Sequence, residues 1–275
     1  MSQTDNAAPV GVFDSGIGGL SVLREIRRLL PHEHLVYAAD SAYVPYGDKS
    51  REFIEQRAIA MTEFLIEQGA KAIVVACNTA TSAAITKLRE RFQLPVIGVE
   101  PALKPAAQKT RSGIIAVLAT SGTLAGDKFV SLHERVARDV EVLTQPCAGL
   151  VEQVEAGELT TAATRTLLQR YVLPLIERGA DTFVLGCTHY PFLASLIRDI
   201  VGPDVSVVDP SPAVARELSR RLEQEGLRSS HRGDGTESFW TSGSTDQVAR
   251  LTALLWDTDC IVKQMANEWA IAHSG

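Results

Sequence analysis

Two cysteines in similar sequence contexts are the residues of this chain best suited to chemistry. Cys77 ends the apolar run 74–76 and Cys187 ends the apolar run 184–186, and a threonine-bearing polar segment follows each of them. A short apolar run bounded by small polar residues is typical of a buried strand, and ligands of open α/β sheets bind where such strands end. We therefore expect both thiols to lie at the mouth of a binding site.

The sequence around the two cysteines belongs to a longer repeat. Similar landmarks recur in the same order at an offset of about 105 to 110 residues, which indicates a duplicated half. The landmark pairs are Asp14 with Thr120, Cys77 with Cys187, and Pro101 with Pro210. Two similar halves that face each other would place one cysteine on each side of a common cleft.

Two thiols that face each other across a cleft are compatible with four uses. A disulfide is disfavoured in a reducing cytoplasm. A metal site would draw on Cys187 and His189, but the close ligand pairs of zinc sites and a fourth ligand are not evident. A single cysteine nucleophile with His189 as its base would leave Cys77 unused. In a two-base proton transfer, one thiolate removes a proton and the other thiol delivers one to the opposite face, so both halves of the repeat take part.

Groups near the thiols could support proton transfer. A free thiol titrates at about pH 8.5, so a thiolate at neutral pH needs a helix N-terminus or a cation nearby, and both cysteines precede predicted helices. Asp14 and His189 are candidates to assist one thiol each. The glycine-rich turn 14–19 offers backbone amides to an anion such as a carboxylate. This turn lacks the glycine spacing of a dinucleotide-binding loop and the Lys-Ser/Thr of a nucleotide P-loop.

The elements that position these residues follow a regular rhythm. Strand-like and helix-like patterns alternate, which predicts parallel sheets with helices on their faces. We predict an α/β fold of two pseudo-symmetric doubly wound domains with mainly parallel sheets and the active site in the interdomain cleft. Residues 1–100 and 211–275 are expected to form the first domain, because the tail has no counterpart after Pro101, and residues 101–210 the second.

Composition excludes several classes of protein. The chain has 275 residues, of which 45% are hydrophobic and 22% charged, which is ordinary for a globular protein with two cores. A net charge of −6 offers no basic stripe for nucleic acid, and no apolar stretch is long enough for a membrane span. Residues 1–9 lack the pattern of a signal peptide, so we expect a cytoplasmic protein. Cys147 and Cys260 are interpreted as small buried hydrophobes.

Four segments together resemble the cofactor-independent aspartate/glutamate racemase family. They are Phe13-Asp14-Ser15-Gly16-Ile17-Gly18-Gly19, Pro45-Tyr46-Gly47, Ala76-Cys77-Asn78-Thr79-Ala80 and Leu185-Gly186-Cys187-Thr188-His189-Tyr190-Pro191. The resemblance runs from about Gly11 to Pro212. It implies racemisation of glutamate for peptidoglycan synthesis, with aspartate or a hydantoin as the alternative substrate in the same family. A two-lobed amino-acid binding protein would have no use for two symmetric thiols.

The resemblance also implies roles for individual residues. The implied catalytic residues are Cys77, Cys187, Asp14 and His189. The implied substrate-binding residues are Asp14, Ser15, Tyr46, Gly47, Asn78, Thr79, Thr188 and His189. Glu155 and Asp40 match further site positions of the family less closely. Neither a cofactor nor a metal is implied, the partner is the small-molecule substrate glutamate, and a homodimer is expected.

Overall fold

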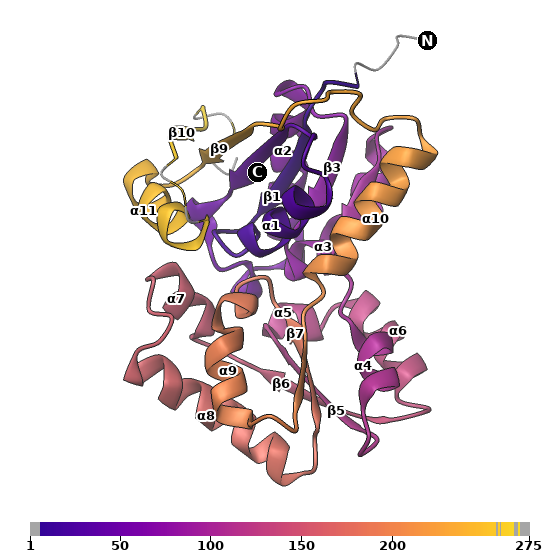
Figure 1. Ribbon diagram of the computed structural model, residues 1–275, viewed down its shortest axis with the longest axis vertical. Coiled ribbons are helices and arrows are strands. Elements are labelled where there is room, and N and C mark those ends of the chain that lie inside the picture. The colour runs from indigo at the N-terminus through magenta and orange to yellow at the C-terminus, as the bar shows by residue number, and fades with distance from the viewer. Residues whose placement is uncertain (1–5, 257, 259, 267–268, 270–275) are drawn as a thin grey trace.

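The computed structural model describes residues 6–256, 258, 260–266 and 269 of the chain. Its strands form two sheets, one above the other along the long axis of the molecule (Figure 1). The first sheet has the order β10-β9-β2-β1-β3-β4 and the second has the order β6-β5-β7-β8. The first-sheet strands are β1 (Val10–Asp14), β2 (Leu35–Ala39), β3 (Ala72–Val75), β4 (Val96–Gly98), β9 (Glu237–Thr241) and β10 (Val262–Gln264).

The second sheet repeats the order of the first. Its strands are β5 (Ile114–Ala119), β6 (Glu141–Pro146), β7 (Thr182–Gly186) and β8 (Ser206–Val208). The order β6-β5-β7-β8 matches β2-β1-β3-β4 strand for strand, and every pairing between the described strands is parallel. The predicted fold class of two pseudo-symmetric, mainly parallel α/β units is therefore confirmed.

Helices cover the faces of both sheets (Figure 1). They are α1 (Leu20–Leu29), α2 (Arg51–Glu67), α3 (Asn78–Arg91), α4 (Leu103–Lys109), α5 (Ser121–Leu124), α6 (Asp127–Val136), α7 (Leu150–Glu155), α8 (Ala162–Glu177), α9 (Ala194–Val201), α10 (Ser211–Gln224) and α11 (Thr245–Trp256). Short 3-10 turns in the described part of the chain are η1 (Ser41–Tyr43), η2 (Tyr46–Asp48) and η3 (Tyr190–Leu193). No helix among the described residues is long and apolar enough to cross a membrane.

The chain beyond residue 210 returns to the first sheet. Helix α10 packs against α1, and β9 pairs with β2 in register from Leu35 opposite Glu237 to Ala39 opposite Thr241. On this basis we propose that the chain divides as the sequence indicated, with residues 1–100 and 211–275 in one domain and residues 101–210 in the other. The largest contiguous apolar core includes Val12 and Val74 of the first sheet and Leu118 and Leu185 of the second.

The helix after Cys77 begins directly after the cysteine. Helix α3 starts at Asn78, so Cys77 is its N-cap residue. The Cys77 sulfur caps this helix by accepting the N–H of Ala80 at 3.4 Å. Cysteine is a weak cap compared with serine or aspartate, so its role was not evident from propensity. This start places the first amides of the helix beside the thiol.

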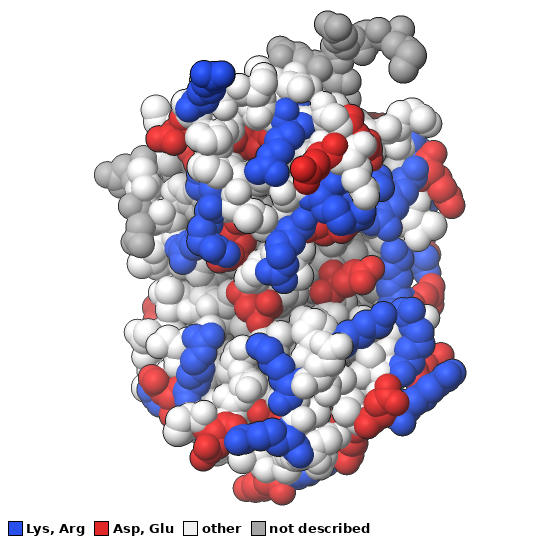
Figure 2. Space-filling view, turned by 45° about the vertical axis from the view of Figure 1, so that its right-hand side comes forward, with Lys and Arg blue, Asp and Glu red and all other residues white. Residues whose placement is uncertain are grey.

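Acidic and basic side chains are intermixed over the upper and lower parts of the face in Figure 2. This agrees with the modest net charge of −6. A basic groove that could follow a nucleic-acid backbone is not evident on this face.

Candidate active site

The residues singled out by sequence lie where the strands of both sheets end. Asp14 is the last residue of β1, Cys77 lies two residues beyond β3, and Cys187 follows β7 directly. One small cavity of about 10 Å³ lies between these strand ends. Its lining is Ser15, Pro45, Tyr46, Gly47, Cys77, Asn78, Thr79, Thr120, Val151, Cys187, Thr188 and His189. Both thiols therefore border the same space, one from each half of the repeat.

Cys77 is buried and lies near the carboxyl group of Asp14. Its sulfur accepts the N–H of Ala80 and lies 3.8 Å from the hydroxyl oxygen of Ser15, to which the thiol donates. Burial raises the pKa of the Cys77 thiol well above its ordinary value, and the neighbouring Asp14 carboxyl raises it further, whereas the Ala80 N–H lowers it. At neutral pH Cys77 is therefore a thiol, and the expected help from the helix N-terminus is outweighed.

Asp14 connects the two halves beneath the cavity. Its Oδ1 accepts the backbone N–H of Ser15 at 2.7 Å, and its Oδ2 accepts the hydroxyl of Thr188 at 3.1 Å. Burial raises the pKa of Asp14, although the positive charge of His189 and hydrogen bonds from Cys77 and Ser15 offset part of this rise. The carboxyl group does not line the cavity itself, so its influence on the site passes through these neighbours.

Cys187 has a different partner from Cys77. Its sulfur lies 3.6 Å from Nδ1 of His189, and Nε2 of the same ring lies 2.7 Å from Oε1 of Glu155. Burial lowers the pKa of His189, but its hydrogen bonds to Cys187 and Glu155 outweigh burial and raise that pKa well above its ordinary value. A protonated imidazole donates from both nitrogens, and here one nitrogen faces the sulfur while the other is held by a carboxylate.

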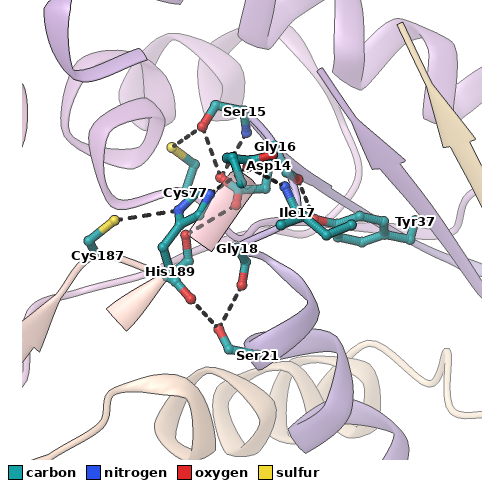
Figure 3. Close-up of polar contacts among 12 residues, drawn as sticks. Asp14, Ser15, Gly16, Ile17, Gly18, Ser21, Tyr37, Cys77, Cys187 and His189 are labelled. Atoms are coloured by element: carbon teal, nitrogen blue, oxygen red, sulfur yellow. Dashed lines mark hydrogen bonds and ion pairs between the residues drawn. The ribbon is translucent and has the colours of Figure 1, made fainter. Parts of the chain in front are cut away.

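The turn after β1 packs closely against Glu155 and His189. Glu155 Oε1 also accepts the backbone N–H of Ile17 at 2.8 Å. A Cβ atom on Gly16 would lie 2.0 Å from that carboxylate oxygen, and one on Gly18 would lie 2.4 Å from Nδ1 of His189. Only glycine allows the backbone to approach so closely. Figure 3 shows the result, with Ser15 beside the Cys77 sulfur and the His189 ring between Cys187 and the turn.

The polar lining of the cavity is suited to a charged small molecule. The side-chain oxygen and nitrogen of Asn78 are both buried, and neither has a hydrogen-bond partner among the described residues. Buried amides are normally paired, so this group is available to a ligand. The hydroxyl of Thr79 contacts those of Thr120 and Thr123 at 2.9 and 3.1 Å across the two halves. Among the described residues, no three His, Cys, Asp or Glu side chains gather as a metal-binding group.

The two loosely matched acidic residues lie behind the cavity. Glu155 holds His189, as described above, and Asp40 accepts the phenol hydroxyl of Tyr46. Neither belongs to the cavity lining. Sequence reasoning missed Thr120 as a lining residue, although the repeat pairs it with Asp14 and so contained the signal. It also missed Val151 of α7, for which the sequence holds no local signal.

Comparison with known proteins agrees with the geometry. The family model for Asp/Glu/hydantoin racemases matches residues 10–218. The chain belongs to this racemase family. A glutamate racemase from Methylococcus capsulatus is 58% identical over 254 residues, which cover 92% of this chain and 94% of that protein. One from Stutzerimonas stutzeri is 54% identical over 262 residues, which cover 95% and 98%.

Solved structures of family members share the architecture. A glutamate racemase isoform from Bacillus anthracis has a TM-score of 0.87 at 33% identity and covers 95% of this chain and 98% of its own. The Escherichia coli glutamate racemase, solved with L-glutamate and an activator, has a TM-score of 0.82 at 34% identity, covering 94% and 97%. An allantoin racemase from Klebsiella pneumoniae, at 20% identity and a TM-score of 0.56, shares the fold.

Proposed function

We propose that this chain interconverts L- and D-glutamate by two-base proton transfer, with Cys77 on one face of the α-carbon and Cys187 on the other. The observation that carries this proposal is that both thiols border one cavity, each from a different half of the repeat. The relatives named glutamate racemase, at 51 to 58% identity over nearly the whole chain, support glutamate as the substrate.

The surroundings of the two thiols suit one direction of the reaction. Cys77 is a thiol, because burial and Asp14 raise its pKa, and the sulfur of Cys187 faces the imidazole of His189. In this direction Cys187 acts as the base and Cys77 as the acid, so the substrate would lose its α-proton to Cys187 and gain one from Cys77. The reverse direction starts from the state in which Cys187 carries the proton and Cys77 is ionised. Each turnover interchanges the two states.

The carbanion formed on the α-carbon must be stabilised by fixed dipoles. We propose that the reaction uses no cofactor and no metal, so this task falls to the hydroxyl, amide and backbone groups around the cavity. The unpartnered amide of Asn78 and the hydroxyls of Ser15 and Thr188 are positioned to bind the substrate, with Thr79 and the backbone at Tyr46 and Gly47. Exclusion of water strengthens each of these interactions.

Substrate must enter by movement of the two halves. Ligand pockets usually measure about 300 to 1,000 Å³, and the cavity of about 10 Å³ is far below that range. We propose that the structure represents a closed form and that the halves separate at the cleft to admit glutamate.

Substrate identity and the two-base mechanism are tested together in heavy water. We expect turnover of L- and D-glutamate in preference to aspartate and hydantoins, without added pyridoxal phosphate and in the presence of a chelator. Deuterium should enter chiefly the inverted product in both directions, because each thiol exchanges its proton with solvent separately. Equal deuterium in the recovered starting isomer would contradict two bases, and faster turnover of aspartate would contradict the substrate.

The cellular role follows from the substrate. We propose that the product D-glutamate supplies peptidoglycan synthesis, and that the protein acts in the cytoplasm as a homodimer. Exposed apolar side chains such as Leu173, at 41%, and Leu254, at 51%, leave surface for a second copy. Light scattering after gel filtration should give twice 29.7 kDa, and a monomer mass at micromolar concentration would contradict the dimer.

A further inference from the structure

A buried ionic cluster lies behind the cavity on the first sheet. The carboxylate of Asp40, directly after β2, accepts two hydrogen bonds from the Arg57 guanidinium, from Nε at 2.8 Å and from Nη2 at 2.7 Å. The phenol hydroxyl of Tyr46 donates to the same carboxylate. The exposed fractions of Asp40, Arg57 and Tyr46 are 0, 2 and 1%. A bidentate pair of this kind, removed from water, fixes both partners in one geometry.

The cluster joins segments that are distant in the sequence. Arg57 belongs to α2, and its Nη2 also donates to the backbone carbonyl of Trp269 at 2.7 Å. The guanidinium carbon lies 4.5 Å from the centre of the Tyr43 ring, which adds a cation–π contact. The Arg57 guanidinium is thereby contacted on several sides and fixed in one orientation. The Asp40 carboxylate that it binds is fixed with it.

Tyr46 connects this cluster to the proposed substrate site. Tyr46 and Gly47 form the start of η2, and both line the cavity, whereas Arg57 and Asp40 do not. Gly47 packs against Thr120 of the other half so closely that a Cβ atom on it would lie 3.0 Å from the Thr120 Cβ. The position of η2 therefore sets one wall of the cavity and one contact across the cleft.

We propose that Arg57 is a positioning residue for the amino-acid subsite. Arg57 holds Asp40, and Asp40 in turn holds Tyr46 and the η2 backbone where they contact the substrate. This inference rests on the proposed function, because it assigns a purpose to the wall of the same cavity. Arg57 does not touch the substrate, so its effect reaches the reaction only through Asp40 and Tyr46.

A second buried ion pair provides a matched control. Lys71 and Glu33 pair at 2.6 Å with side-chain exposures of 0 and 2%, also between segments of the first sheet. They precede β3 and β2, so they lie at the amino ends of the strands, whereas Asp40 lies at the carboxyl end of β2. Loss of either pair disturbs a buried charge in one sheet, but only one pair supports the cavity.

The test compares steady-state kinetics of Arg57→Lys, Asp40→Asn and Tyr46→Phe with those of Glu33→Gln, at a temperature where circular dichroism shows each variant folded. Lysine keeps the charge of Arg57 but cannot make the bidentate contact. We expect each cluster variant to lower kcat/KM for glutamate on the order of 10- to 100-fold, mainly by raising KM, because η2 is displaced while the two thiols stay in place. Glu33→Gln should keep the wild-type KM within about twofold.

A double variant separates positioning from general destabilisation. If Arg57 acts through Tyr46, Tyr46→Phe combined with Arg57→Lys should raise KM no further than the worse single variant does, since both changes break the same chain of contacts. Multiplicative effects on KM, or a KM for the cluster variants equal to that of Glu33→Gln, would overturn the inference. Should Arg57→Lys not fold, Asp40→Asn and Tyr46→Phe decide the question by the same KM comparison with Glu33→Gln.

The wild-type protein distinguishes this inference from the proposed function. If the wild type fails to racemise glutamate, the proposed function is wrong. If it racemises glutamate and the cluster variants match the control, only the role of Arg57 is wrong.

Discussion

At the scale of single residues, Cys77 and Cys187 have the same side chain in two electrostatic settings. Cys77 is close to the buried carboxyl of Asp14, and Cys187 is close to an imidazole held by Glu155. Burial and the neighbouring carboxyl favour the thiol form of Cys77, whereas the sulfur of Cys187 faces an imidazole. The proposed two-base mechanism uses this difference between two nearly symmetric positions.

Replacement of either thiol by serine should abolish most of the activity. Cys77→Ser and Cys187→Ser are each expected to reduce racemisation of glutamate by at least about 10³-fold, since a hydroxyl is a far weaker base than a thiolate and positioned acid–base groups contribute about 10²- to 10⁴-fold. Circular dichroism of the substrate at a single wavelength measures the rate. Cys147→Ala is the control, because this third buried thiol lies outside the cavity lining. Near wild-type racemisation by either serine variant would remove that thiol from the mechanism.

Glu155 should determine the pH range over which His189 is protonated. His189 has a raised pKa, and Glu155 is one cause of the rise, so Glu155→Gln should lower that pKa. The cationic imidazole is then lost at a lower pH, and the alkaline limb of kcat/KM should shift to lower pH while the fold is retained. The measurement is the pH profile of kcat/KM in both directions of racemisation. An unchanged alkaline limb in the variant would mean that Glu155 does not control this proton.

At the scale of elements, the carboxyl ends of parallel strands in the two sheets bring several candidate residues together. Because β1, β3, β5 and β7 run parallel in the two sheets, their carboxyl ends gather Asp14, Cys77, Thr120 and Cys187 between the sheets. The loops that follow supply the fine placement. The turn after β1 approaches His189 through glycine, and η2 is anchored by the Asp40 cluster.

Hydrogen bonds from the loop before β5 to Asp181 should make the free energy of unfolding depend on pH in the acid range. Partial burial raises the pKa of Asp181, but hydrogen bonds from Thr110, Arg111, Ser112 and Thr182 outweigh burial and lower that pKa to about 2, from an ordinary value of 3.8. A lowered folded-state pKa contributes stability that is present above about pH 4 and is lost as the pH falls towards 2. Asp181→Asn should therefore lower the free energy of unfolding at pH 7 by about 1 kcal/mol, after allowance for solvent screening.

Urea unfolding of the wild type and Asp181→Asn at several pH values checks this prediction. The difference between the two free energies of unfolding should shrink as the pH falls from about 4 towards 2. A difference that stays constant over this range would show that the hydrogen bonds to the carboxylate carry no pH-dependent stability.

At the scale of the whole molecule, the duplicated halves meet around a space too small for the proposed substrate. The contact of Gly47 with Thr120 and the hydrogen bonds of Thr79 cross the cleft beside that space. Admission of glutamate must therefore break these contacts.

Bound glutamate should therefore slow hydrogen exchange at the cleft. We expect amides of η2 and α5 to exchange on the order of tenfold more slowly at saturating D-glutamate, because a ligand that contacts both halves suppresses their local opening. Interior amides of β5 serve as the control and should change little. Equal protection of all these segments would indicate a general gain in stability and would contradict a hinge-like closure.

The sequence by itself determined the fold class and the expectation that the two cysteines share a cleft, and its resemblance to the racemase family implied most of the cavity residues. Apolar runs, helix periodicity and the repeat offset are local or regular signals, so they can be recognised in the sequence alone. The similar sequence contexts of Cys77 and Cys187 predicted a shared cleft, and both thiols border one cavity.

Tertiary structure alone decided how these residues act on one another. The contact of Glu155 with His189 joins α7 to the loop after β7, and the contact of Arg57 with Asp40 joins α2 to the end of β2. Such contacts depend on how distant segments pack, and no periodic pattern records them. Protonation follows from the same packing, since burial and the nearest charges set each pKa. For this reason the sequence could name two thiols, but only the fold shows that one lies beside a carboxyl group and the other beside an imidazole.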